Sequence, residues 1–401
     1  MNSEFFQGNR KNLTHGLGSG VFAASAYTKL QGIGDMAHPF KQESNFWYLT
    51  GIQSPDWQLI IDLIQGKSWL IAPDVDTSHQ LFDGSLTPEV AKAISGVDEV
   101  IDQKEADLLL QNLAKTHTIC FTLGIPPYAE QADFVLNPAP ERLRRQHEKL
   151  FNQVIDCQQE LTKLRAIKQS YEISIIEKAA NTSVIAFEKA KKELALCRYE
   201  YEIDAEIGYC FRRHKASHAF EPIVANGKNA CTLHYVDNSR GLQPGSLLLI
   251  DAGARLESYS ADITRTFAVG EVTKRQGEVH EAVQIAESRI IDLIKPGFLI
   301  KEYIGASDTI MKEALLSLGL LKHKNDTVAY RRYFPHAISH GLGLDVHESL
   351  GGYKEFQPGM VLTVEPGIYI PEESVGVRIE DDILVTTDGN KNLTAALSTD
   401  L

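Results

Sequence analysis

The sequence predicts a mixed α/β protein with two domains. With 401 residues, the chain exceeds what one ordinary hydrophobic core organises. In its first part, short apolar runs alternate with turn-rich stretches and helical stripes, which is an α/β pattern. All three tryptophans lie in the first 70 residues, whereas the acidic residues discussed below lie beyond residue 250. The two ends of the chain therefore differ in character.

The elements of the first part follow from local patterns. Apolar runs at 58–63 and 68–72 predict strands, and the stretches 91–97 and 105–113 predict helices. The segment 140–165 is polar, charged and helical in character, so we interpret it as a connector. We place the boundary near residue 160, which gives an N-terminal domain of residues 1–160 and a C-terminal domain of residues 161–401.

The second part begins with an amphipathic helix. Apolar residues recur at helical spacing from Ile173 to Phe187, and Ser170 is the expected N-cap. A second helical stripe runs from Val279 to Ile290 and stops before Lys295-Pro296-Gly297. The remaining apolar runs predict four strands, at 246–253, 262–269, 361–370 and 375–386.

A faint internal repeat relates these strands. Asp251-Ala-Gly is followed by Asp262, and Glu365-Pro-Gly is followed by Glu380. Each pair predicts an antiparallel hairpin with one acid per strand. Two facing hairpins of this kind would bring four acids together, as a duplicated αβ unit would.

Composition and charge exclude several classes of protein. The net charge is −13, and an acidic surface repels phosphate backbones, so we expect no nucleic-acid partner. No apolar run reaches the roughly 18 residues of a membrane span. The first residues also lack the basic segment followed by an apolar segment that is typical of a signal peptide. None of the five cysteines forms a Cys-x-x-Cys pair. A reduced, cytoplasmic protein is the resulting expectation.

Four carboxylates and one imidazole determine the functional hypothesis. An ionised carboxylate in a buried strand needs a counter-charge. If four converge, repulsion is about 4 kcal/mol per close pair at an effective dielectric constant of about 20. Two divalent cations would cancel the four charges, which makes a two-metal hydrolase the leading hypothesis. The predicted ligands are Asp251, Asp262, His340, Glu365 and Glu380.

The ligand chemistry restricts the metal and the reaction. Oxygen-rich ligands with one imidazole favour Mn²⁺, with Co²⁺, Zn²⁺ and Fe²⁺ as competitors. Such a pair lowers the pKa of a shared water and polarises a carbonyl oxygen. Further histidines, at positions 234, 336 and 347, lie near the same elements and could donate to a developing oxyanion.

Several ordered motifs resemble one family of peptidases. They resemble the pita-bread metallopeptidases, family M24, and within it the Xaa-Pro aminopeptidases (aminopeptidase P) and the Xaa-Pro dipeptidases (prolidase). Residues 45–51, Asn-Phe-Trp-Tyr-Leu-Thr-Gly, resemble the smaller creatinase-like α/β domain that precedes the catalytic domain in that family. The catalytic motifs are Asn226-Gly227 through His234-Tyr235, Ile250-Asp-Ala-Gly, Asp262-Ile-Thr-Arg-Thr-Phe, Ser339-His-Gly-Leu-Gly-Leu-Asp-Val-His, Thr363-Val-Glu-Pro-Gly-Ile-Tyr and Val377-Arg-Ile-Glu-Asp.

The resemblance implies a role for each predicted ligand. Asp251 would chelate one metal ion, and Asp262 and Glu380 would bridge both ions. His340 and Glu365 would complete the second site. Glu365 would also move a proton from the attacking water to the leaving nitrogen.

The resemblance also implies roles for residues around the ions. His234 and His347 would hydrogen-bond the substrate and the tetrahedral intermediate. His336, Tyr369 and Arg378 would line or brace a proline pocket. The stretch 217–222 matches no family pattern, which leaves the substrate range on that wall open.

The substrate implied is a peptide with proline in its second position. An Xaa-Pro bond has no N–H and a fixed φ, so a dedicated pocket is useful. The close alternative is an Xaa-Pro dipeptidase with the same metals. More remote alternatives are a non-catalytic binding module and a creatinase-like hydrolase without metal. The resemblance further implies a homo-oligomer, a dimer or tetramer, in which the N-terminal domain supports assembly and limits substrate access.

Overall fold

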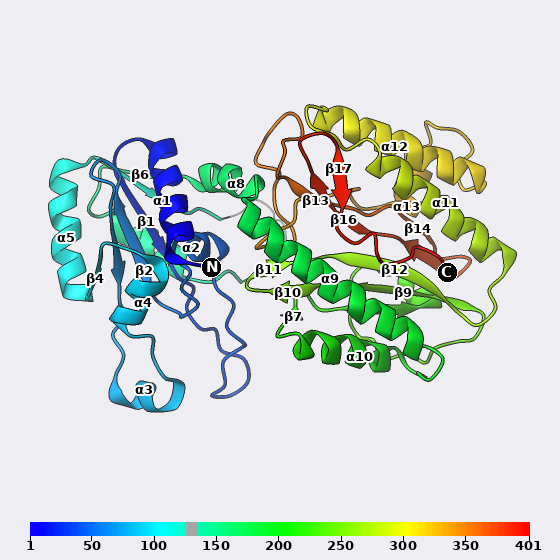
Figure 1. Cartoon of the computed structure of the whole chain (residues 1–401), viewed down its shortest axis with the longest axis horizontal. Coiled ribbons are helices and arrows are strands. Elements are labelled where there is room, and N and C mark those ends of the chain that lie inside the picture. Colours follow the sequence, from blue (N-terminus) through cyan, green and yellow to red (C-terminus); the bar gives the residue numbers. More distant parts are fainter. Residues whose placement is uncertain (126–134) are drawn as a thin grey trace. The chain divides into compact units, whose positions relative to one another are not determined.

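A computed structural model describes residues 1–125 and 135–401, and it divides the chain into two units, Met1–Leu164 and Arg165–Leu401 (Figure 1). The first unit holds a six-stranded sheet in the order β4-β3-β2-β1-β5-β6. Its strands are β1 (Val21–Ser25), β2 (Gln58–Asp62), β3 (Lys67–Ile71), β4 (Glu99–Ile101), β5 (Ile119–Thr122) and β6 (Gln153–Asp156). Its helices are α1 (Ser3–Leu17), α2 (Ser44–Thr50), α3 (Thr77–Asp83), α4 (Pro88–Ser95), α5 (Gln103–Thr116), α7 (Ala139–His147) and the start of α8 (Gln158–Ala166).

The local predictions for the first unit are confirmed, with one correction. The expected strands correspond to β2 and β3, the expected helix 91–97 overlaps α4, which ends at Ser95, and the expected helix 105–113 lies within α5. The segment 140–165, however, is more than a connector, because it contains β6, which pairs in parallel with β5. Since β6 is a mostly exposed edge strand, its polar sequence gave no strand pattern.

The second unit is built from paired helices and short antiparallel strands. Its helices are α9 (Ser170–Glu193), α10 (Glu200–Arg213), α11 (Lys274–Ile291), α12 (Ile300–Ser317) and α13 (Thr327–Tyr333), with the 3₁₀ turn η1 (Gly227–Cys231). Its strands are β7 (Ser217–His218), β8 (Ile223–Asn226), β9 (Ser246–Ala252), β10 (Ala254–Leu256), β11 (Tyr259–Ser260), β12 (Ile263–Val269), β13 (Val361–Val364), β14 (Gly367–Ile370), β15 (Val375–Arg378), β16 (Asp381–Val385) and β17 (Asn390–Asn392).

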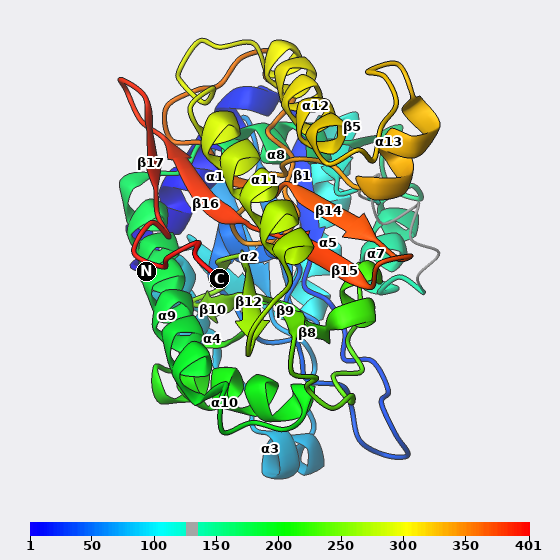
Figure 2. The ribbon, with the colours of Figure 1, turned by 90° about the vertical axis from the view of Figure 1, so that its right-hand side faces the viewer.

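Two hydrophobic cores back two groups of strands. One core joins apolar residues of α9 and α10, such as Phe187 and Phe211, to β8, β9 and β12. The other joins α11 and α12, through residues such as Val283 and Met311, to β13, β14, β15 and β16 (Figure 2). Each half is therefore a helix pair behind antiparallel strands, the arrangement expected of a duplicated αβ unit.

The hairpins differ in regularity. The first is as predicted, since β9 and β12 pair along their length with Asp251 opposite Thr264. The second is interrupted, because the predicted strands 361–370 and 375–386 each divide in two at Glu365-Pro366 and at Ile379-Glu380. Pro366 has no N–H to donate to the ladder, so the pairing breaks at the acidic residues.

The start of the long helix α9 also differs from the prediction. Gln169, rather than Ser170, is the N-cap, and it forms a reciprocal capping box with Glu172. The capping box satisfies two backbone donors at once, which a serine one residue later would not do. Within the described part of the chain, every helix is too short or too polar to cross a membrane.

Gly253 lies where the chain leaves β9 directly after Asp251-Ala252. A Cβ atom there would lie 1.7 Å from the carbonyl oxygen of Ala261. We expect Gly253→Ala to lower the free energy of unfolding by about 3 kcal/mol, because backbone would have to move. Chemical denaturation measures this change.

The matched control is Gly277→Ala, within α11, where a Cβ meets no atom within 4 Å. This change should raise the free energy of unfolding by about 0.5–1 kcal/mol. If both variants were equally stable, the backbone at Gly253 would not lie as close to the Ala261 carbonyl oxygen as described.

Candidate metal centre

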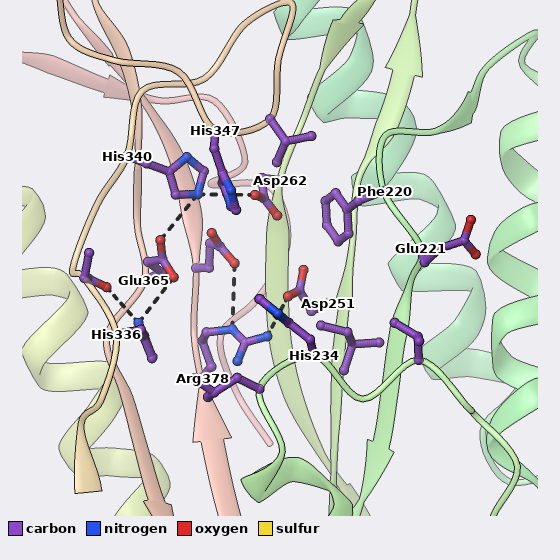
Figure 3. A pocket seen from close by; sticks show the side chains of 16 residues that line it. Phe220, Glu221, His234, Asp251, Asp262, His336, His340, His347, Glu365 and Arg378 are labelled. Carbon is purple, nitrogen blue, oxygen red and sulfur yellow. Dashed lines mark hydrogen bonds and ion pairs between the residues drawn. The ribbon is translucent and has the colours of Figure 1, made fainter. Parts of the chain in front are cut away.

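A cavity of about 590 Å³ in the second unit collects the predicted site residues (Figure 3). Every one of them except Tyr369 lines this cavity. The full lining comprises Phe220, Glu221, Ile223, Leu233, His234, Val236, Asp251, Asp262, His336, Ala337, His340, Val346, His347, Glu365, Arg378 and Glu380.

The two strand groups meet at the acidic residues. Asp251 lies in β9, Asp262 directly precedes β12, and Glu365 and Glu380 lie at the two strand breaks of the other group. The Glu380 backbone N–H donates to the Thr264 carbonyl (3.0 Å), which joins the two groups at this point. Acids that are far apart in sequence therefore face one another.

Their donor atoms form overlapping groups that suit cations. Ligand atoms of Asp251, Asp262 and Glu380 all lie within 4.8 Å of one another, as do those of His340, Glu365 and Glu380. Glu380 belongs to both groups, as expected of a bridging carboxylate. A third group combines Asp262 and His340 with His347, so the His347 imidazole also lies close to the predicted ligands.

The His340 imidazole presents a lone pair to carboxylates. Its Nδ1 lies 3.0 Å from the Gly341 carbonyl, which can only accept, so Nδ1 carries the proton. Burial lowers the pKa of His340 to about 4, so the ring is neutral. Its Nε2 lies 3.4 Å from Glu365 Oε1 and 3.6 Å from Asp262 Oδ2. An unprotonated nitrogen facing two carboxylate oxygens fits a metal ligand set.

Asp251 has one engaged oxygen and one free oxygen. Arg378 donates to Asp251 Oδ2 (2.5 Å), and the buried Oδ1 has no hydrogen-bond partner within the described residues. A buried unpartnered carboxylate oxygen is costly unless a cation takes the place of a donor. Together with the His340 geometry, this atom shows that the residues fit the divalent ions that the sequence predicts.

The carboxyl groups resist ionisation in the absence of such ions. Burial is the largest cause that raises the pKa of Asp262 and of Glu380 well above their usual values, and the neighbouring acids raise them further. Burial also raises the pKa of Glu365 to about 8. These carboxylates therefore need positive charge to coexist in the ionised state.

Two threonines that the sequence analysis missed support the acids. Thr264 Oγ1 donates to Glu380 Oε2 (2.5 Å), and Thr363 Oγ1 donates to Glu365 Oε1 (3.2 Å). Thr264 follows Asp262, and Thr363 precedes Glu365, by two positions. Because residues i and i+2 share a face of a strand, the period-2 pattern could have identified both.

A buried hydrogen-bond chain lies beside the ions' expected position. Arg378 Nη1 donates to the Tyr369 hydroxyl (2.9 Å), and that hydroxyl donates to His336 Nε2 (2.8 Å). The His336 Nδ1–H in turn donates to the Ala337 carbonyl (2.7 Å), which fixes the tautomer. Burial lowers the pKa of His336 to about 3, so the ring is neutral. Tyr369 lies behind the cavity wall and braces its two neighbours.

The remaining histidines line the cavity. His347 packs edge-on against His340, with ring centroids 4.3 Å apart, and burial lowers its pKa. His234 enters from the segment after η1, on the Asp251 side (Figure 3). Apolar side chains missed by the sequence analysis complete this wall. They are Phe220, Ile223, Leu233, Val236 and Val346.

Comparisons with known proteins identify the family. Residues 174–387 match the sequence profile of metallopeptidase family M24, and residues 6–121 match the aminopeptidase P N-terminal domain. An Xaa-Pro aminopeptidase from Haemophilus influenzae is 36% identical over 90% of this chain and 87% of its own length. One from Escherichia coli is 34% identical over 98% of this chain and 94% of its own length. The structure of E. coli aminopeptidase P with the inhibitor Pro-Leu matches with a TM-score of 0.86 at 31% identity, covering 100% of this chain and 96% of that chain.

The fold and the ligand groups define a metal-dependent hydrolase of the exopeptidase class. The chain belongs to metallopeptidase family M24 and carries an aminopeptidase P N-terminal domain. The pita-bread architecture expected for the second unit is thereby confirmed. Membership of the family implies divalent metal ions, and the donor set described above fits them.

The raised carboxyl pKa values predict how metal and pH affect stability. In the metal-free protein, Glu365 has a folded-state pKa of about 8 against an ordinary value of 4.5. The folded protein therefore holds this proton more tightly than the unfolded chain does, which adds to the free energy of unfolding below pH 4.5. That contribution is lost as the pH rises towards 8, and it amounts to about 1.4 kcal/mol for each unit by which the pKa is raised. We therefore expect metal-free protein to melt at a lower temperature at pH 8 than at pH 5.

Differential scanning calorimetry with and without Mn²⁺ measures this effect. Added ions should raise the melting temperature more at pH 8 than at pH 5, because they bind the ionised carboxylates. Glu380→Gln should show a smaller difference. A metal-free melting temperature that rises from pH 5 to pH 8 would contradict the raised pKa values.

Proposed function

We propose that the protein is an Xaa-Pro aminopeptidase, which removes the first residue of peptides that have proline in the second position. The observation that carries the proposal is the convergence of ligand atoms from five residues in two groups that share Glu380. The relatives that this chain matches along most of their length are Xaa-Pro aminopeptidases, which supports proline specificity and disfavours an Xaa-Pro dipeptidase. The complete ligand set disfavours both a non-catalytic binding module and a hydrolase that works without metal.

Each ligand has a proposed position. Asp251 would hold one ion through the oxygen that Arg378 leaves free, and His340 and Glu365 would hold the other. Asp262 and Glu380 would bridge the two. When bound, two divalent ions supply a water of lowered pKa and polarise the scissile carbonyl. Hard oxygen ligands with one imidazole favour Mn²⁺, with Co²⁺, Zn²⁺ and Fe²⁺ as competitors.

The chain's own residues would handle the protons and the developing charge. Glu365 would take a proton from the attacking water and deliver it to the proline nitrogen, since its carboxyl group lines the cavity together with the other proposed ligands. His234 and His347, on the cavity wall, would donate hydrogen bonds to the substrate carbonyl as it becomes an oxyanion.

The proline ring would pack beside His336, with Arg378 and Tyr369 as the brace. The neutral His336 ring offers an apolar face, and its two nitrogens are already engaged by Tyr369 and Ala337. A tertiary amide has no N–H to donate. A wall that demands no hydrogen bond from that nitrogen therefore suits proline.

We further propose a cytoplasmic homo-oligomer, a dimer or tetramer, in which residues 1–160 support assembly and limit access to the cavity. All five cysteines are free, which suits a reducing compartment. The net charge of −13 disfavours nucleic acid as a partner.

A peptide-length series tests the substrate class. With Mn²⁺ present, Xaa-Pro-Yaa-Yaa peptides should be cleaved at the Xaa-Pro bond, and matched peptides with alanine in place of proline should be cleaved far more slowly. Mass spectrometry of the products measures both. Cleavage confined to Xaa-Pro dipeptides would favour the dipeptidase, and no cleavage of any peptide would favour the binding module.

Substitutions separate metal binding from catalysis. Glu380→Ala and Asp262→Ala should abolish both metal retention and turnover, because each removes a shared ligand. His347→Ala should lower kcat by about 10²-fold, as loss of an oxyanion donor does, while metal content stays unchanged. Elemental analysis with steady-state kinetics measures both. Loss of metal in His347→Ala would make His347 a ligand instead.

A further inference from the structure

A buried ion network lies directly beneath the loop that carries His347. Glu348 is only 5% exposed in its side chain, and its carboxylate meets Arg165 Nη2 (2.5 Å) and Lys168 Nζ (3.0 Å). Arg165 also binds Asp345 (2.6 Å). Arg165 at the end of α8 and Lys168 between α8 and α9 thus balance the charges of Glu348 and Asp345 in the loop.

The Glu348 carboxylate also organises the loop from inside. It accepts hydrogen bonds from the backbone N–H groups of Leu344 (2.8 Å) and Asp345 (3.2 Å). The neck of the loop is closed by two backbone hydrogen bonds between Gly341 and Glu348 (2.9 and 2.8 Å). A Cβ at Gly343 would lie 2.8 Å from both Glu348 oxygens, so the carboxylate occupies the space that this glycine leaves.

The His347 imidazole has no such support of its own. Within residues 1–125 and 135–401, no hydrogen bond holds its ring, which contacts His340 edge-on. Its position therefore depends on the backbone between Asp345 and Glu348, both of which the network holds. Figure 3 shows the ring directed to the cavity beside Asp262.

We propose that Glu348, held by Arg165 and Lys168, is a positioning residue that sets the His347 imidazole against the substrate. This inference rests on the proposed function of His347 as a donor to the reacting carbonyl. Small displacements of such a donor lower rates strongly, because the alignment of hydrogen bond and reacting atom is lost. Glu348 acts through its neighbour and contacts neither substrate nor metal.

A double-mutant cycle tests the proposal. Glu348→Gln should lower kcat/KM by about 10–100-fold with unchanged manganese content. In a His347→Ala background the same change should have less than about a twofold effect, since coupled residues are not additive. Gly343→Ala should lower kcat/KM in the same way, because its Cβ would displace the Glu348 carboxylate without removing a charge. If Glu348→Gln does not fold, Gly343→Ala replaces it in the cycle.

Glu172→Gln is the matched control. Glu172 is buried beside Lys168 but binds Tyr259 (2.7 Å) and the Gln169 backbone (2.9 Å) rather than the loop. Its kcat/KM should stay within about twofold. Equal losses from Glu348→Gln in both backgrounds, or no loss in the parent protein, would overturn the proposal. If His347→Ala alone left kcat/KM unchanged, the proposed role of His347 would fail instead.

Discussion

The second unit must hold four carboxylates close together in its interior, where their negative charges repel one another. Asp251 and Asp262 come from one strand pair, and Glu365 and Glu380 come from another, more than a hundred residues further along the chain. Burial is the largest cause that raises the pKa of Asp262, Glu365 and Glu380, and the neighbouring acids raise it further. One arginine, Arg378, already compensates part of the charge, and it engages only one oxygen of Asp251. The rest of the charge calls for cations. The fold thus stores an electrostatic penalty that metal binding relieves.

The hydrophobic cores behind the two strand groups keep the four acids close together. Each strand group is backed by a helix pair, so the acids cannot separate without opening a hydrophobic core. Closer to the carboxylates, Thr264 and Thr363 donate hydrogen bonds to Glu380 and Glu365, and the network around Glu348 binds the loop between His340 and His347. The hydrophobic cores make the strands rigid, whereas the polar groups fix the orientation of individual side chains.

Much of this site could be predicted from the sequence, because the proposed ligands are residue types that rarely occur in apolar strands. Asp251 in Leu-Leu-Ile-Asp-Ala-Gly and Glu365 in Thr-Val-Glu-Pro-Gly stand out for that reason. The pairing of the polar strand β6 depended on tertiary contacts. The strand break at Pro366, in contrast, follows from the missing N–H of a proline, which the sequence already contains. The Glu348 network was equally hidden, because Arg165 and Glu348 lie 183 positions apart and each alone reads as an ordinary surface charge.

If these carboxylates meet around a pair of ions, anomalous X-ray diffraction from crystals grown with Mn²⁺ should locate both ions. We expect two manganese peaks about 3.5–4 Å apart, with Asp262 and Glu380 between them and His340 on one ion only. A single peak, or two peaks that do not share Glu380, would contradict this arrangement.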